Sequence, residues 1–124
     1  MALTVSGYGS SGGLRYKIAH ESTANQTADI DVFGTGGTIL SMDIDNQHSS
    51  TIYFKLKTTT GAWTSGSTDP DFQWRLAASP NGTKRFDFPD GIPFSQLTFW
   101  CNSSPAASAT DAPGGNVLVT FICS

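Results

Sequence analysis

Short stretches of alternating apolar and polar residues recur along the chain, and turn-forming residues separate them. The alternation is clearest at residues 14–18, 38–44 and 50–57, where every second side chain is apolar. This two-residue period is typical of a β-strand with one buried face. Further stretches of the same kind lie at 72–76, 84–88 and 96–101, and at 116–123 apolar residues occupy both faces of a predicted strand. The pattern predicts about eight or nine strands and no helix.

The same pattern predicts how two of the strands are arranged. Leu40, Met42 and Ile44 follow one another at every second position, so we expect them on one face of their strand. The polar residues 45–49 predict a short loop, and the strand at 50–57 follows directly. Two strands joined by so short a loop are expected to pair antiparallel.

The remaining segments complete the predicted order. A strand-like unit is expected at 29–33, and a turn at 89–94, which is rich in Pro and Gly. Residues 1–13 contain several Gly and Ser residues and predict a short strand followed by a flexible N-terminal arm. Residues 14–124 are expected to form a single β-sandwich domain.

The composition supports an all-β fold. The chain has 124 residues, enough for one domain with one core, and Glu21 is its single glutamate. Thr, Val, Ile and aromatic residues suit strands, whereas Glu favours helices. Because each strand has one apolar face, a second layer must cover the sheet. We therefore predict an antiparallel two-sheet sandwich, jelly-roll-like, with a small β-barrel as the alternative.

The charge pattern excludes some partners. The chain has 7 basic and 10 acidic residues, and the basic ones are scattered in pairs. Nucleic-acid binding is not expected, because it requires a basic stripe that neutralises phosphates. The first residues carry no positive charge and no long apolar run, and no later segment is apolar enough to span a membrane. We expect synthesis and folding in a cytosol and no membrane partner.

Candidate catalytic and metal-binding residues are present but not grouped in a recognisable motif. His20 and His48 could each work with a Ser and an Asp, yet no nucleophile motif accompanies them. Three pairs of aspartates offer oxygen ligands for Ca²⁺, and Asp turns explain the same residues. These pairs are Asp43/Asp45, Asp69/Asp71 and Asp87/Asp90. We expect no catalytic residues, no cofactor and no metal, and therefore no enzyme.

The cysteines and tryptophans lead to further expectations. Cys101 and Cys123 each end a predicted strand, and a hairpin of these strands would hold them too far apart for a disulfide, which favours two buried free thiols. Trp74 is expected in the core, and Trp100 on an outer surface. Trp63 lies in a polar loop, where partner contact, loop packing and sugar stacking are all open. We take Trp63 as a partner-contact residue.

The acidic residues Asp69 and Asp71 complete this candidate contact site. They flank Pro70 in the same loop as Trp63, and a rigid proline turn can aim both carboxylates in one direction.

The middle of the chain resembles small virion proteins of tailed bacteriophages, in particular the β-sandwich decoration or cement proteins of their heads. The resemblance covers roughly residues 38–122. It rests on three segments: residues 42–56, from Met42 to Leu56; residues 66–71, with Gly66 and Asp69-Pro70-Asp71; and residues 88–94, with Phe88 and Phe94.

The resemblance implies a non-enzymatic protein, often a homotrimer, that binds the major capsid protein and bridges its subunits. It also implies a place on the capsid surface of the virion, after synthesis in the host cytoplasm. The alternative function that we consider is a receptor- or glycan-binding module at the tip of a fibre, because Trp63 and the acidic loops could contact sugars.

Overall fold

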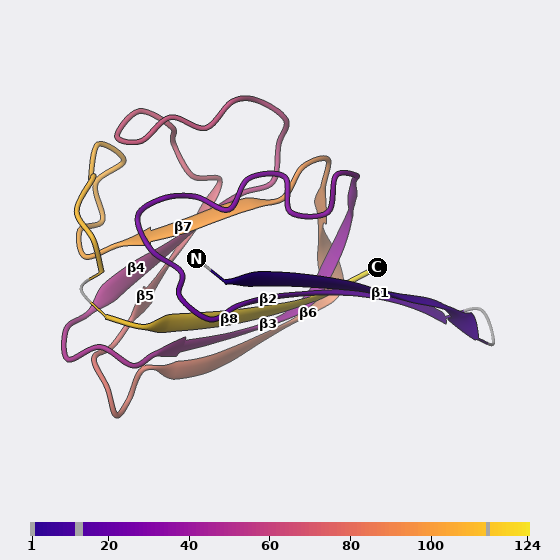
Figure 1. Ribbon diagram of the computed structural model, residues 1–124, viewed down its shortest axis with the longest axis horizontal. Coiled ribbons are helices and arrows are strands. Elements are labelled where there is room, and N and C mark those ends of the chain that lie inside the picture. The colour runs from indigo at the N-terminus through magenta and orange to yellow at the C-terminus, as the bar shows by residue number, and fades with distance from the viewer. Residues whose placement is uncertain (1, 12–13, 114) are drawn as a thin grey trace.

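The computed structural model describes residues 2–11, 14–113 and 115–124. These residues form two antiparallel sheets that pack face to face (Figure 1). The five-stranded sheet has the order β1 (Leu3–Ser11), β2 (Leu14–Glu21), β8 (Val117–Cys123), β3 (Gly37–Asn46) and β6 (Thr83–Phe94). The three-stranded sheet has the order β5 (Phe72–Leu76), β4 (Ile52–Lys57) and β7 (Thr98–Asn102). The predicted all-β sandwich is confirmed, and the described strands do not close into a barrel.

The connections between the strands are jelly-roll-like. From β3 onward the chain passes repeatedly from one sheet to the other, and the last strand, β8, returns to lie between β2 and β3. In this part of the chain only β4 and β5 follow each other within the same sheet. Most contacts therefore join segments that are distant in the sequence, as is usual for two-sheet β proteins.

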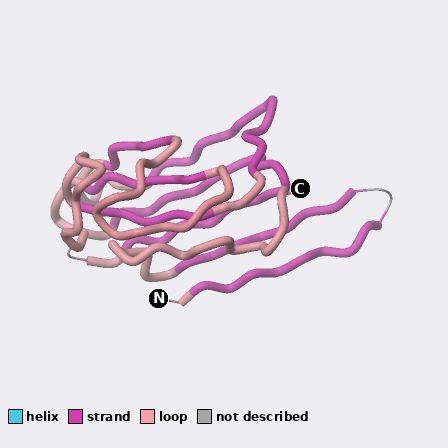
Figure 2. The backbone as a smooth tube through the Cα atoms, turned by 90° about the horizontal axis from the view of Figure 1, so that it is seen from above, coloured by secondary structure: helices cyan, strands magenta, loops and turns pink. Residues whose placement is uncertain are grey.

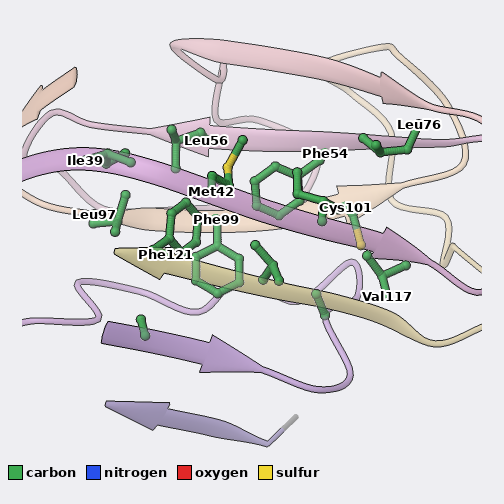
Figure 3. Close-up of a cluster of buried hydrophobic side chains, with 14 of the residues drawn as sticks. Ile39, Met42, Phe54, Leu56, Leu76, Leu97, Phe99, Cys101, Val117 and Phe121 are labelled. Atoms are coloured by element: carbon green, nitrogen blue, oxygen red, sulfur yellow. The ribbon is translucent and has the colours of Figure 1, made fainter. Parts of the chain in front are cut away.

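Aromatic rings at the centre of the sandwich join the two sheets (Figure 3). Phe54 and Phe99 come from the three-stranded sheet, and Phe121 comes from β8 of the opposite sheet. Their ring centroids lie 5.1–6.1 Å apart, in the range of favourable aromatic pairs. All three side chains are buried, as are Ile52 and Leu56, which continue the apolar face of β4.

An irregular segment takes the place of a fourth strand beside β7. Asp29 forms a single bridge with Phe99 through two backbone hydrogen bonds of 2.9 and 3.1 Å. Val32 donates to the carbonyl of Leu97, and Cys101 donates to the carbonyl of Asn25. The strand-like unit predicted at 29–33 is thus reduced to one bridge, because the chain turns away immediately after it, at residue 31, with a positive φ.

The predicted antiparallel pair of strands at 38–44 and 50–57 is wrong. These strands are β3 and β4, and they lie in opposite sheets. The buried Asn46 organises the crossing: its side chain donates to the carbonyls of Ser50 and Ala77, each at 2.9 Å, and accepts from the His48 amide. Because both strands have one apolar face, the sequence pattern fits two facing sheets as well as one shared sheet.

A bulge changes the predicted faces of β3. The pairing of β3 with β6 and β8 shifts between Ile39 and Ser41, so Ile39 and Met42 are both buried, whereas Leu40 is only partly buried. On β6 the extra residues lie at 88–91, where Gly91 has a φ of 72°. The turn predicted at 89–94 is therefore wrong as a chain reversal, because β6 continues through it as a bulged strand.

Strands β1 and β2 form a hairpin that extends beyond the rest of the sandwich (Figure 2). Strand β2 pairs with β8 only from Lys17 to Glu21, so residues 14–16 of β2 and residues 8–11 of β1 have no third strand beside them in the described part of the chain. The described part of the predicted N-terminal arm is thus the strand β1. Residues 1, 12 and 13 of that arm lie outside the described residues.

Candidate functional site

The candidate contact residue Trp63 lies on a loop that folds over the outer face of the three-stranded sheet. Its ring packs edge-on against Trp100 of β7, with the centroids 5.8 Å apart. Trp100 faces outward, as expected, but the loop leaves it only 4% exposed. Trp63 is itself partly buried. Of the roles that the sequence left open for Trp63, loop packing is therefore present in the structure. Part of the Trp63 ring stays exposed.

The acidic residues of the same loop have different environments. Asp71 accepts hydrogen bonds from the Thr58 amide at 2.8 Å and from the hydroxyls of Thr58 and Thr59 at 3.2 Å. Although partial burial opposes it, these bonds lower the pKa of Asp71 below its usual range. Asp71, at the end of the loop, thus ties it to the residues at its start, directly after β4. Asp69 is exposed on the same loop, so its carboxylate is the more available of the two.

Lys55 is the buried residue that the sequence did not predict. It points to the outer face of β4, yet its side chain is fully buried. Its ammonium group donates to Asn102 Oδ1 at 2.9 Å and to the Ala106 carbonyl at 2.7 Å. Burial lowers the pKa of Lys55, and the nearby carboxylate of Asp111 opposes this shift. Two polar loops therefore cover a face that the alternation assigned to solvent.

The two covering loops also contact each other. The backbone of Gly66 lies against Ser108 and Thr110 of the second loop. Asn102 and Ser103 hold that loop through hydrogen bonds of 2.9 Å to Asp111. The outer face of the three-stranded sheet is thus covered by a packed layer of loops (Figure 1).

On the outer face of the five-stranded sheet, β-pairing brings several candidate catalytic residues together. His20 lies opposite Thr120, Thr120 lies opposite Asp43, and Asp43 lies opposite Arg85. His20 Nδ1 is 2.8 Å from Thr120 Oγ1. Together with Asp45, the first three of these residues line an open cavity of about 230 Å³. The other candidate histidine lies in the β3–β4 connection, where its ring accepts from the amide of residue 50 at 3.0 Å.

The two aspartates that line this cavity form polar interactions near the protein surface. Asp43 forms an ion pair with Arg85 at 3.3 Å. Asp45 accepts from the Thr83 hydroxyl at 2.9 Å and from the Gln47 amide at 3.0 Å. No group of three or more His, Cys, Asp or Glu side chains among the described residues is arranged to hold a metal ion. None of the three aspartate pairs that the sequence offered belongs to a larger group of potential metal ligands among these residues.

A second acidic group, which the sequence analysis did not identify, is buried inside the sandwich. Glu21 of β2 is fully buried, and Asp29 is 5% exposed. Glu21 Oε2 accepts from the backbone nitrogen of Ala2 at 2.6 Å, whereas Glu21 Oε1 has no hydrogen-bond partner among the described residues. Burial, together with the hydrogen bond and charge of Glu21, raises the pKa of Asp29 to about 7. Two buried carboxyl groups that interact with each other are unusual in a protein interior.

The cysteines are free and buried, as expected, although the hairpin on which that expectation was based does not form. Cys101 and Cys123 belong to strands of opposite sheets. Burial raises the pKa of each thiol to about 12. Both are therefore neutral near pH 7, which suits packing and not nucleophilic chemistry.

Aromatic residues close the open edge of the sandwich between β5 and β6. Trp74 stacks with Phe72 at 5.9 Å and contacts Phe86 and Phe88 across the edge at 5.6 and 6.3 Å. Trp74 packs against the core, as predicted, but is only partly buried. Phe72 is 39% exposed. This edge is a partly exposed aromatic strip, which is a common composition for a protein contact.

Comparison with known proteins gives no relative: no family model, no curated protein and no solved structure matches the chain. Among the described residues, no helix has the length and apolar character needed to cross a membrane. The functional argument therefore depends on the residues and geometry of this chain alone.

Proposed function

We propose that the chain is a structural virion protein that decorates a bacteriophage capsid and stabilises it by bridging subunits of the major capsid protein. The observation that carries this proposal is the free edge of β1. Strand β1 is the outermost strand of its sheet, and its nine residues include no charged residue and no proline. Its pairing with β2 is irregular only between Tyr8 and Ser11, so the part from Leu3 to Tyr8 is a regular edge. Most β proteins protect such an edge with charges, prolines or bulges, because an unprotected edge pairs with another chain.

The opposite edge of the same sheet illustrates the contrast. Strand β6 carries Lys84, Arg85 and Asp87, two prolines and a bulge. These are the features that discourage pairing. The fold is thus protected at one edge and open at the other, which favours the addition of one strand from a capsid subunit to β1.

The rest of the molecule suits the same role. The packed loops over the three-stranded sheet offer Trp63 and Asp69 as further contacts, and Asp71 fixes their loop. A homotrimer would multiply weak contacts of this kind, since the second and third attachments are intramolecular. Binding to the assembled shell alone would stabilise that state by mass action.

Cryo-electron microscopy of heads from the phage that encodes the chain tests the location. We expect the sandwich on the capsid surface, with β1 beside a strand of the capsid protein. Heads that lack the chain at their surface would refute the proposal.

A binding assay with heads that lack the chain tests the role of the edge. Val5→Lys places a charge on β1, at a side chain that is already 44% exposed. We expect at least a tenfold loss of binding with an unchanged melting temperature. Gln73→Lys, on an exposed position of β5, is the matched control and should bind normally. Equal binding by both variants would show that β1 is not the contact.

A second candidate is a glycan-binding module at a fibre tip, and the aromatic strip favours it. Phe72 presents an exposed ring stacked on Trp74 with an interplanar angle of 13°. Flat exposed rings can support sugar stacking. A glycan array would test it, and binding that disappears in Phe72→Ala would favour this function over capsid decoration.

A further inference from the structure

We propose that Lys55 and Asn102 become joined by an intramolecular amide bond between Lys55 Nζ and Asn102 Cγ, with release of ammonia. This covalent modification would fasten β4 to β7 beneath the loops that cover the three-stranded sheet. The proposal is independent of the capsid role, which makes no use of the buried amine.

The placement of the two side chains is the first argument. Lys55 lies opposite Trp100 in the pairing of β4 with β7, and Asn102 is two positions further along β7, on the same face. Diagonal neighbours of this kind are within reach of a long side chain. Lys55 Nζ is 2.9 Å from Asn102 Oδ1, and a C=O bond is about 1.2 Å long, so Nζ lies within about 4 Å of Asn102 Cγ. A nucleophile attacks from about 3–3.5 Å, which a small rotation of the lysine stem reaches.

Burial of both reacting groups is the second argument. Lys55 is 0% exposed and Asn102 is 1% exposed. Lys55 Nζ donates to the Ala106 carbonyl at 2.7 Å, and Asn102 Nδ2 donates to the Asp111 carbonyl at 2.9 Å. The loop of residues 103–113 therefore holds the amine and the carboxamide in fixed positions and keeps bulk water away from them. Fixed geometry lowers the entropic cost of the reaction, and exclusion of water limits competing hydrolysis.

The protonation of Lys55 is the third argument. Only a neutral amine is a nucleophile, and burial lowers the pKa of Lys55. The carboxylate of Asp111 opposes this shift, but in the described part of the chain no carboxylate lies within ion-pair distance of Lys55 Nζ. A buried ammonium group without a direct counter-ion is costly, whereas an amide carries no charge. Burial therefore favours both the reactive form of the lysine and the product.

The reaction exchanges one amide nitrogen for another and needs no oxidant or co-reactant. Neutral Lys55 Nζ forms a bond to Asn102 Cγ, and the electron pair of the C=O bond moves to Oδ1. A proton then passes from Nζ to Nδ2, the electron pair returns, and the bond between Cγ and Nδ2 breaks. Ammonia leaves and takes up the proton that Lys55 released on becoming neutral. The products are one secondary amide and one ammonium ion.

The bond would link positions that are 47 residues apart in the sequence. A cross-link over such a distance restricts the unfolded chain as a disulfide does, and it thereby stabilises the folded state. Unlike a disulfide, an amide resists reduction. It therefore suits a chain whose two cysteines are free thiols.

The first experiment is an intact-mass measurement of the denatured protein after the folded protein has been incubated for several days at mildly alkaline pH. We expect the wild-type mass to be lower than that of the unreacted chain by about 17 Da, the mass of one ammonia. Lys55→Ala and Asn102→Ala should keep the masses of their unreacted chains. Lys57→Ala, at the next outward-facing lysine of β4, is the matched control and should lose ammonia as the wild type does. A wild-type mass that stays at the unreacted value would overturn the proposal, and so would an equal loss in Lys55→Ala.

The second experiment locates the mass loss in the wild-type protein, so it remains decisive if the variants do not fold. A cyclic imide at Asn81-Gly82 would also release ammonia, but hydroxylamine opens an imide and leaves a secondary amide intact. The protein is treated with hydroxylamine, digested with a protease and sequenced by tandem mass spectrometry. We expect a branched peptide in which the segment with Lys55 is joined to the segment with Asn102. Ammonia loss confined to Asn81-Gly82, or separate unmodified peptides with Lys55 and Asn102, would refute the proposal.

Discussion

Replacement of Asp29 by asparagine should change how the stability of the protein depends on pH. The pKa of Asp29 is raised from 3.8 to about 7, first by burial and then by the hydrogen bond and charge of Glu21. The folded state therefore holds a proton that the unfolded state releases between about pH 4 and 7. Stability should fall as the pH rises through this range.

The magnitude follows from the two pKa values. A difference of one pKa unit corresponds to about 1.4 kcal/mol, so the full shift of Asp29 corresponds to about 4 kcal/mol. Between pH 5 and pH 8 the expected loss of stability is about 3 kcal/mol, because part of the effect lies below pH 5. The amide side chain of the Asp29→Asn variant stays neutral at every pH and can donate to Glu21, so this variant should not show the loss.

Urea unfolding of both proteins at pH 5 and pH 8 measures the effect. For a typical slope of about 1–3 kcal/mol per molar urea, the midpoint of the wild-type protein should fall by about 1–3 M relative to Asp29→Asn. Asp71 and Asp111 have lowered pKa values, so their contribution is confined to more acidic solution. Asp90→Asn, at an exposed site, is the control. If the two unfolding midpoints stay parallel between pH 5 and 8, the buried pair does not share a proton.

Three further predictions concern the covered face and the thiols. Trp63→Ala should lower the free energy of unfolding by about 2 kcal/mol, because an aromatic pair and its apolar contact are lost; unchanged thermal stability would leave partner contact as its main role. Lys55→Ala should lower the free energy of unfolding, measured with urea, by about 2–4 kcal/mol, because it removes the buried aliphatic stem and the donor to Asn102. Lys84→Ala, on the exposed part of β6, is the control. An equal effect of both substitutions would contradict the burial of Lys55. Cys101 and Cys123 should react with a thiol reagent only after unfolding, which absorbance measures; rapid reaction in the native protein would contradict their burial.

The sequence predicted the strands well because each needed only local information. The alternation in β4, from Ile52 to Leu56, fixes which side chains face the core, and the structure agrees. It does not fix the partner strand, since an apolar face fits either sheet. The predicted β3–β4 pairing was therefore wrong. The side chain of Asn46 directs the chain from one sheet to the other, and it does so through a hydrogen bond to Ala77, which is distant in the sequence.

The environments of individual side chains were harder to predict, because they depend on loops. Lys55 alternates as a solvent-exposed residue does, and it is buried only because residues 103–113 fold over it. Glu21 and Asp29 are eight positions apart and carry no motif. The sequence gives no signal for them, because the alternation of β2 places Glu21 on the same face as Arg15 and Lys17, whereas in the structure this face is the buried one at Ala19 and Glu21. Trp63 was recognised as unusual, but its contact with Trp100 required the fold.

The unequal widths of the two sheets limit how far any self-association of this molecule can grow. The wider sheet leaves the core-facing side of β1 uncovered, so Leu3 and Val5 form a small apolar ledge beside the free strand edge. A strand that adds there gains backbone bonds and apolar contact together, and only one orientation offers both. The far edge at β6 has aromatic residues beside it, but its prolines and its bulge interrupt the backbone groups that a further strand would need, so it does not accept the next molecule in the same way. Edge-to-edge stacking of copies would therefore stop after one step, which favours closed assemblies over fibres.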